Sequence, residues 1–583
     1  MGLDVSTRTA RSVGRSLRWA PTLQDHVAGV VLGVAALLLL FLVGYPLLWL
    51  VLGGLGLPRE VSLSYFTRAF TDPANLVPLQ NTLILAAGAG VLSVVLGVPL
   101  AWATARTDMP LGRLVHALVA LSYITPPYLV ALAYIILLGP NAGYFNRLLM
   151  GLLGLEEGPF NIFSMGGVIF VISLHVFAYP YFLTHGALQA LDAPLEESAR
   201  VLGAGGWTVM RRITLPLVAP AITGGALLAA VESMADFGPQ AFLGLPAQIV
   251  YLPTRIYGAI GSYPPRYSDA SALAILLVVL TVVGLYVQRG YLERRSYVTV
   301  SGRGVRSRQT ALGPWKWPLL ALCLGVVFFS ALAPLGVLVV ASFSKVWTDP
   351  LGPSNITLAN FHEALIDNQV SVRGIFNSFK LAFGAATIAT LLGLFVAYID
   401  QRTQARGRRL LDYLAILPLG LPGTVLAVAL LQAFIRPPVQ LYATIWILLV
   451  AYIVRFIPRA VRSASASLRQ VDASLEEAAR ITGASWFRSV WHVLVPMLRS
   501  GLLVAWLLVF IPSLNELSAT ALLYSSGTET ISIAVYRLNE LGQLEVVAAL
   551  SVVTIAVILV ASLVMQWVVG KSGASVAQDI KVG

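Results

Sequence analysis

The chain has 583 residues, of which 57% are hydrophobic and only 11% are charged. Soluble globular domains carry about 25% charged residues, so this composition excludes a soluble globular protein. The net charge of +12 would suggest a nucleic-acid partner in a soluble protein, but the basic residues here lie between long apolar stretches. Because Lys and Arg gather in the cytoplasmic loops of membrane proteins, we expect a membrane protein and no nucleic-acid partner.

Twelve apolar stretches are long enough to cross a bilayer, since a hydrocarbon core of about 30 Å requires about 20 helical residues. The predicted spans are 28–52, 80–105, 113–138, 166–189, 217–240, 270–288, 317–343, 376–399, 410–434, 442–465, 499–523 and 546–568. The first stretch is too long for the core of a signal peptide, so we expect it to be retained. The sequence thus predicts an all-α polytopic membrane protein.

Basic residues mark one side of the membrane. Every second loop is rich in arginine, namely 106–113, 190–216, 289–316, 400–409 and 455–499. The positive-inside rule places these loops and both termini in the cytoplasm.

The two halves of the chain repeat each other. Three residue pairs share an offset of 296: Asn81 with Asn377, Ala101 with Ala397 and Pro126 with Pro422. A later polar segment repeats at an offset of 280, and the difference of 16 falls in the outer loop 139–163, whose counterpart is only 436–440. Each half has six predicted spans, an even number, so we expect parallel repeats related by an axis along the membrane normal.

This repeat divides the chain into five parts. They are a cytoplasmic segment 1–27, a first six-helix domain 28–288, a cytoplasmic linker 289–316, a second six-helix domain 317–570 and a cytoplasmic tail 571–583. Asn81 and Asn377 open the second span of each domain, where they either form hydrogen bonds between helices or cap the helix at the interface.

The segment repeated at an offset of 280 lies in two of the basic loops. Its first copy comprises Glu196, Glu197, Ser198, Ala199, Arg200 and Gly203, and its second copy comprises Glu476, Glu477, Ala478, Ala479, Arg480 and Gly483. Ser474 and Glu477 have the spacing of a capping box, and the two glycines suit the left-handed turn that ends a helix. Each copy predicts a helix of about two turns, which is unstable alone and needs a partner surface.

These loops resemble the EAA loop of ATP-binding-cassette importer permeases, whose pattern is Glu-Ala-Ala, three residues, Gly, nine residues and Ile-x-Leu-Pro. The first copy departs from it at Ser198, and the second has Val493 and Val495 in place of Ile and Leu. The resemblance implies the type I importer permease fold and a place in a bacterial cytoplasmic (inner) membrane. It also implies that the two short helices dock onto two copies of an ATPase subunit, and that a periplasmic or lipid-anchored binding protein delivers the substrate.

The chain lacks a phosphate-binding GxxxxGK[ST] motif; Gly570, Lys571 and Ser572 form only a fragment of one. We therefore expect no enzymatic activity and no cofactor in this chain, with ATP and Mg²⁺ bound by the partner ATPase subunits. No metal site is expected either, because the single cysteine, Cys323, lies in an apolar run and the six histidines are scattered.

Polar residues at the outer end of the fifth span of each half are candidates for the translocation path or its gate: Glu232, Asp236, Asn515 and Glu516. An acid at the bilayer centre costs roughly 2.5–3.5 kcal/mol, so these side chains should face the bundle interior or the outer vestibule. The alternative is a polar cluster that caps the helix ends locally.

The stretches 235–238 and 516–520 look like those of fused permeases of ferric iron importers. Ferric iron is therefore the expected substrate, with thiamine, 2-aminoethylphosphonate and polyamines as alternatives. A secondary transporter of the major facilitator type would also have twelve spans in two parallel halves, but it leaves the paired loops unexplained.

Overall fold

The structure is a computed structural model that describes residue 30 and residues 33–58, 60–191, 193–294, 310–349, 352–403 and 407–579. Within these ranges the chain is helical and has only two isolated β-bridges, Thr107 with Thr310 and Ser344 with Ile356. The predicted all-α class is confirmed.

The first half contains thirteen α-helices within the described ranges. They are α2 (Tyr45–Gly54), α3 (Ser64–Thr71), α4 (Pro73–Arg106), α5 (Gly112–Ile124), α6 (Pro127–Leu138), α7 (Tyr144–Leu153), α8 (Met165–Val176), α9 (Ala178–Ala190), α10 (Ala193–Val201), α11 (Gly206–Val209), α12 (Leu215–Ala235), α13 (Leu252–Gly261) and α14 (Tyr267–Arg294). The π-helical turns η1 (Leu40–Gly44) and η2 (Met210–Thr214) lead into α2 and α12, and η3 (Gln240–Gly244) precedes α13.

The second half repeats this order. Its α-helices are α15 (Lys316–Val327), α16 (Ala333–Ser342), α17 (Ala359–His362), α18 (Gln369–Arg402), α19 (Arg408–Ile416), α20 (Gly423–Phe434), α21 (Ile445–Leu468), α22 (Ser474–Ile481), α23 (Trp486–Ser489), α24 (Val495–Leu514), α25 (Thr520–Leu523), α26 (Ile531–Glu540) and α27 (Leu544–Asp579). The π-helical turns η5 (Phe328–Leu332), η7 (Glu363–Asp367) and η9 (Val490–Leu494) join them, with 3-10 turns η4 (Gly313–Trp315), η6 (Pro353–Asn355) and η8 (Leu417–Gly420).

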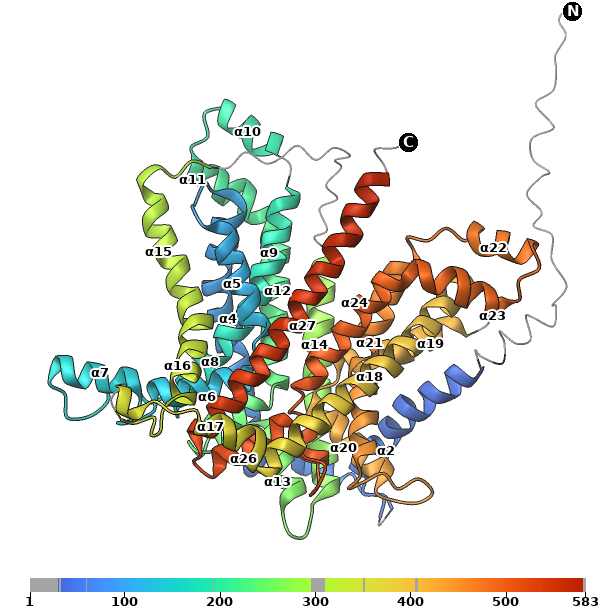
Figure 1. Cartoon of the computed structure of the whole chain (residues 1–583), viewed down its shortest axis with the longest axis horizontal. Helices are drawn as coiled ribbons and strands as arrows, with labels where there is room; N and C mark the ends of the chain where they lie inside the picture. Colours follow the sequence, from blue (N-terminus) through green and yellow to red (C-terminus); the bar gives the residue numbers. More distant parts are fainter. Residues whose placement is uncertain are drawn as a thin grey trace, which may run out of the picture.

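The repeat holds at the level of single residues. Helices α4 and α6 match α18 and α20 at an offset of 296, and α8 and α12 begin 280 residues before α21 and α24. In Figure 1, α10 and α22 lie at the same end of the molecule, while α13 and α26 lie at the other. The two halves therefore have the same orientation, as expected for parallel repeats.

Two of the twelve predicted spans are wrong as single helices. The span 113–138 is bent by 99° between α5 and α6, and the span 410–434 is bent by 117° before α20. Both breaks fall at the repeated proline, Pro126 or Pro422, which lacks an N–H and forces the preceding residue out of the helical region; Thr125 and Leu421 accordingly have ψ of 126° and 121°.

Nine single helices and the two bent pairs of the described part are long and apolar enough to cross a membrane. Helix α21 takes the place of the tenth predicted span. It has 24 residues but carries Arg455, Arg459 and Arg462, so it is less apolar than the other spans.

The two halves exchange their first helices. Helix α2 packs between α14 of its own half and α20 of the other, and α16 packs between α27 and α6. A hydrogen bond accompanies each contact: Tyr45 Oη of α2 donates to Ala433 O of α20 (3.4 Å), and Tyr134 Oη of α6 donates to Phe329 O of η5, the turn that leads into α16 (2.6 Å). Each bent span is therefore covered by a helix of the opposite half.

Two helices run past the predicted domain bounds. Helix α14 continues to Arg294, inside the predicted linker 289–316, and α27 continues to Asp579, inside the predicted tail 571–583. The segment 1–27 and the middle of the linker lie outside the described residues. The outer loop 139–163, which has no long counterpart, contains α7.

Asn81 and Asn377 form hydrogen bonds to distant backbone. Asn81 Nδ2 donates to Val250 O (3.0 Å), and Asn377 Nδ2 donates to Gly527 O (3.1 Å) and Glu529 O (2.9 Å). The neighbouring hydroxyls repeat as well, because Thr82 accepts from Leu252 N and Ser378 accepts from Ile531 N, both at 2.9 Å. These bonds fix the segments before α13 and α26 to the starts of α4 and α18.

We predict that Asn377→Ala destabilises the second half, because the carbonyl groups of Gly527 and Glu529 lose their buried donor. Losing a buried partner costs about 1–3 kcal/mol. The measurement is the thermal unfolding of the purified protein in detergent, with Asn539→Ala at the exposed end of α26 as the matched control. Equal melting temperatures for the two variants would contradict the prediction.

Candidate functional site: paired docking loops and a central cavity

The repeated loops form the two short helices that the sequence predicts, α10 and α22. The predicted capping box is wrong, because α22 begins at Ser474 and its N-cap, Ala473, has no side-chain hydrogen bond. Asp472 Oδ1 accepts from Ser474 N (2.9 Å) instead, and this bond lowers the pKa of Asp472. An acid two residues upstream therefore takes the role expected of Ser474.

Gly203 and Gly483 end the two helices. Their φ angles are +87° and +91°, values that favour glycine because it has no side chain. In both loops the N–H of the following alanine reaches back five residues, from Ala204 to Ala199 O (2.9 Å) and from Ala484 to Ala479 O (3.1 Å). This pattern is the Schellman stop.

The residues predicted to dock onto the ATPase differ in exposure. Those with exposed side chains are Glu197, Ser198, Glu477, Ala478 and Arg480, together with the two glycines. Ala199 and Ala479 are half-buried, and the side chain of Arg200 lies outside the described residues. Apolar side chains beside them are also open, above all Val201 and Leu202 (87% each) and Ile481 (86%). Each loop therefore presents an acid and an apolar edge on the same end of the molecule.

Glu196 and Glu476 point the other way, into their own halves. Glu196 lies 3.4 Å from Arg106 and accepts from Thr214 Oγ1 (2.8 Å). Glu476 is 7% exposed; it lies 3.2 Å from Arg402 and accepts from Tyr398 Oη (3.0 Å). Both acids belong to the predicted ATPase-docking set, which stays a prediction, and the structure pairs them with Arg106 and Arg402, the last residues of α4 and α18.

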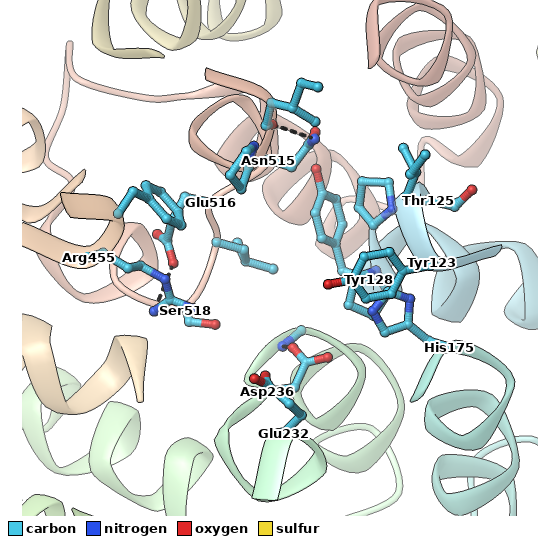
Figure 2. Close-up of a pocket in the computed structure, with 18 of the residues that line it drawn as sticks. Tyr123, Thr125, Tyr128, His175, Glu232, Asp236, Arg455, Asn515, Glu516 and Ser518 are labelled. Atoms are coloured by element: carbon cyan, nitrogen blue, oxygen red, sulfur yellow. Dashed lines mark hydrogen bonds and ion pairs between the residues drawn. The ribbon is translucent and has the colours of Figure 1, made fainter. Parts of the chain in front are cut away.

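A cavity of about 410 Å³ lies between the two halves. Its walls come from the break between α5 and α6, the helices α8 and α9, the end of α12, and α21, α24 and α27 of the second half. Figure 2 shows Glu232 and Asp236 on one wall, Arg455 and Glu516 on a second, and the aromatic groups around His175 on a third.

All four residues predicted for the path line this cavity. Glu232 is exposed to it and has no ion-pair partner within 4.0 Å in the described part of the chain. Asp236 Oδ1 accepts from Gly238 N (3.1 Å), and Asn515 Nδ2 donates to Ile511 O (3.3 Å). Glu516 is buried and lies 3.4 Å from Arg455.

Glu516 also performs the capping role that the alternative interpretation assigned to this cluster. Its carboxylate accepts from the N–H groups of Ala519 (3.1 Å) and Thr520 (3.0 Å) and from Thr520 Oγ1 (2.8 Å) at the start of α25. A single acid thus caps a helix, pairs with an arginine and lines the cavity.

The repeat relates the two sides of the cavity. At the offset of 280, Asp236 corresponds to Glu516 and His175 corresponds to Arg455. Arg455 reaches Glu516 across the second break, where a Cβ on Gly423 would lie 1.7 Å from its Nη1. His175 is shorter and instead lies 3.3 Å from Ser122 O, which leaves open space beside the first break.

Sequence reasoning missed the aromatic and basic wall of the cavity: Tyr123, Tyr128, His175, Tyr179, Arg455 and Arg459. The repeat could have linked two of them, since Arg455 and His175 are equivalent positions at the offset of 280. The hydroxyl of Tyr128 is buried and has no hydrogen-bond partner among the described residues. Among the described residues no three His, Cys, Asp or Glu side chains are placed to hold a metal ion.

The chain matches the family described as binding-protein-dependent transport system inner membrane component, over residues 93–296 and 389–572. The chain belongs to this family. The two matches fall in the two halves, so the permease carries the family domain twice. This membership confirms the resemblance to importer permeases and excludes the facilitator alternative.

The permease is similar to curated relatives over most of its length. It is 28% identical to the ferric transport system permease protein FbpB of Actinobacillus pleuropneumoniae, over 84% of this chain and 71% of the relative. It is also 28% identical to the putative ferric transport system permease protein FbpB 1 of Haemophilus influenzae, over 86% and 78%. A putative 2-aminoethylphosphonate permease protein, PhnV of Salmonella typhimurium, is 29% identical over 44% of this chain and 94% of its own.

Two crystal structures of a bacterial alginate ABC transporter also match. One is 18% identical over 43% of this chain and 95% of that chain, with a TM-score of 0.34. The other, in complex with a periplasmic protein bound to an alginate pentasaccharide, is 21% identical over 48% and 97%, with a TM-score of 0.37.

We predict that Gly423→Ala displaces Arg455 from Glu516, because the added methyl group would also lie 2.7 Å from Ser518 Cβ. Breaking a buried ion pair costs about 3 kcal/mol or more. The measurement is thermal unfolding together with substrate uptake. Gly325→Ala on α15, which has nothing within 4 Å, is the matched control. Unchanged unfolding and uptake in Gly423→Ala would show that Arg455 has room to move.

Proposed function

We propose that this permease forms the translocation path for ferric iron in an ATP-driven importer. A binding protein delivers the iron, and two copies of a separate ATPase subunit hydrolyse ATP with Mg²⁺. The observation that carries the proposal is the match to two ferric permeases over 84% and 86% of the chain. The 2-aminoethylphosphonate relative, in contrast, covers 44%.

The cavity chemistry supports a cationic cargo. Arg455 neutralises Glu516 at 3.4 Å, while Glu232 and Asp236 keep carboxylates without an ion pair in the described part of the chain. Oxygen ligands suit hard cations. Conduction needs contacts weak enough to release the ion, so a few carboxylates along the path are sufficient for this role.

One observation favours 2-aminoethylphosphonate as a second candidate. Arg459 lines the cavity without an acidic partner within 4.0 Å in the described part, and it lies 5.2 Å from the ring of Phe456. A cavity that carries both carboxylates and this guanidinium also fits a zwitterion with a phosphonate and an amine.

The proposal fixes the orientation. The end of the molecule that carries α10 and α22 faces the cytoplasm of a bacterium, in its inner membrane, and both termini lie there as well. Glu197 and Glu477, with the apolar edge formed by Val201, Leu202 and Ile481, then meet the ATPase subunits. The opposite end, with α7 and α13, receives the binding protein.

We predict that vesicles containing the permease, the ATPase and the binding protein accumulate ferric iron only when ATP is hydrolysed. The measurement is uptake of radiolabelled ferric iron, with a non-hydrolysable ATP analogue as the control. An excess of 2-aminoethylphosphonate should not compete. Accumulation of labelled 2-aminoethylphosphonate without accumulation of iron would show that the phosphonate is the substrate and iron is not. Uptake of either compound without ATP would overturn the whole proposal.

We predict that Glu197→Lys together with Glu477→Lys abolishes ATP-coupled uptake while the protein still inserts into the membrane. Both side chains are exposed, so the reversed charges repel the partner without disturbing the fold. The measurement is the stoichiometry of the ATPase that co-purifies with the permease. Arg499→Glu on the first turns of α24 is the charge-reversal control, and a normal stoichiometry in the double variant would refute the docking role.

A further inference from the structure

Glu196 and Glu476 each precede an exposed glutamate of the loop, and each forms an ion pair within its own half of the chain. Glu196 pairs with Arg106 at 3.4 Å, and Glu476 pairs with Arg402 at 3.2 Å. We call these two ion pairs the latches. Their acids are related by the offset of 280 and their arginines by the offset of 296, so the same contact forms in both halves.

Each latch is shielded from solvent. The side chain of Arg106 is 4% exposed and that of Glu196 is 14% exposed; the values for Arg402 and Glu476 are 17% and 9%. An ion pair at an exposed site contributes little to stability, whereas removing one partner of a buried pair is strongly destabilising because it leaves an uncompensated charge. The latches are therefore firm contacts between a docking helix and a membrane helix.

The arginines connect the docking helices to the path. Arg402 ends α18, and its Nη2 also donates to Leu468 O (3.3 Å) at the last residue of α21 and to Val471 O. Helix α21 carries Arg455 and Arg459 into the cavity. In the first half, Arg106 ends α4, which packs along α9 and α12, and both of these helices line the cavity.

Other hydrogen bonds support each latch, and they differ between the halves. In the second half, Trp486 Nε1 donates to Tyr398 Oη (3.0 Å), which in turn donates to Glu476 (3.0 Å). In the first half, Thr214 of η2 donates to Glu196 (2.8 Å). Both networks join the docking helix to the segment that follows it, so the loop is held at its two ends.

We propose that Glu196, Arg106, Glu476 and Arg402 are positioning residues that transmit the displacement of the docking helices to the cavity walls. The exposed Glu197 and Glu477 hold the ATPase, and the latches carry its movement into the membrane. This inference deepens the proposed function and rests on its ATP-driven mechanism. Without its latch, a docking helix would move with the ATPase, but the movement would not reach the membrane helices of its own half.

The test uses the complete complex of permease, ATPase and binding protein in lipid. The variant is Glu196→Gln with Glu476→Gln, which removes the charges and keeps the shape. We expect the ATPase to co-purify normally and uptake per ATP hydrolysed to fall by about tenfold. The matched control is Asp269→Asn, which breaks the exposed pair of Arg68 and Asp269 (3.6 Å) and should leave the ratio unchanged.

A second readout does not depend on the cargo. Cysteines replacing Gly151 and Leu541, in a chain whose only native cysteine is Cys323, carry spin labels on the two halves at the outer end. A non-hydrolysable ATP analogue should change the distance between the labels in the wild-type complex and not in the double variant. No change in the wild-type complex would count against the ATP-driven mechanism itself, whereas an equal change in both would overturn the latches alone.

A charge-reversal pair distinguishes a loss of coupling between ATPase and permease from a general loss of folding. Arg402→Glu with Glu476→Arg restores a pair of opposite charges, so we expect it to recover most of the coupling that Glu476→Arg alone loses. If these variants fail to fold, Tyr398→Phe removes one hydrogen bond from Glu476 and should lower the ratio partially. Loss of ATPase co-purification in the glutamine variant, or full coupling in Tyr398→Phe and the glutamine variant, would refute the proposal.

Discussion

The structure depends on one constraint, which is that a helix can be interrupted inside a membrane only where its backbone is not exposed to lipid. The permease interrupts two spans, at Pro126 and at Pro422. It satisfies the constraint by covering each break with a helix from the opposite half, α16 over α6 and α2 over α20. The first break faces a cavity instead of lipid, and the bonds from Tyr134 and Tyr45 close the two contacts.

The two halves have the same arrangement of helices, but they place different side chains on the two sides of the cavity. The second half uses a long side chain, Arg455, which fills the space over Gly423 and neutralises Glu516. The first half places the shorter His175 at the equivalent position, and Asp236 has no ion pair among the described residues. The duplicated framework therefore sets the shape, and a few substitutions between the halves decide where the charge and the open volume lie.

The sequence was sufficient for the class of fold, the repeat and the two short loop helices, α10 and α22. Each of these depends on spacing along one segment, such as the glycine six residues after Glu197 and Glu477. It was insufficient where a residue's role depends on a partner far away in the chain. Hydropathy predicts one helix over 113–138, although the chain bends by 99° at Pro126. Glu196 and Glu197 are the same residue type in sequence, and only the structure shows Arg106 beside Glu196. His175 has no polar residue directly beside it in sequence, and only the structure places it on the cavity wall near the break after α5.

The exchange of first helices has a consequence for how such a chain can be made. If the polypeptide were severed between α14 and α15, neither fragment would be a self-sufficient bundle, because each would expose the bent span that its counterpart normally shelters. Two separate genes would therefore have to produce an obligate heterodimer, whose subunits meet during insertion. Joining them in one chain guarantees equal amounts of both and makes the mutual sheltering an intramolecular event.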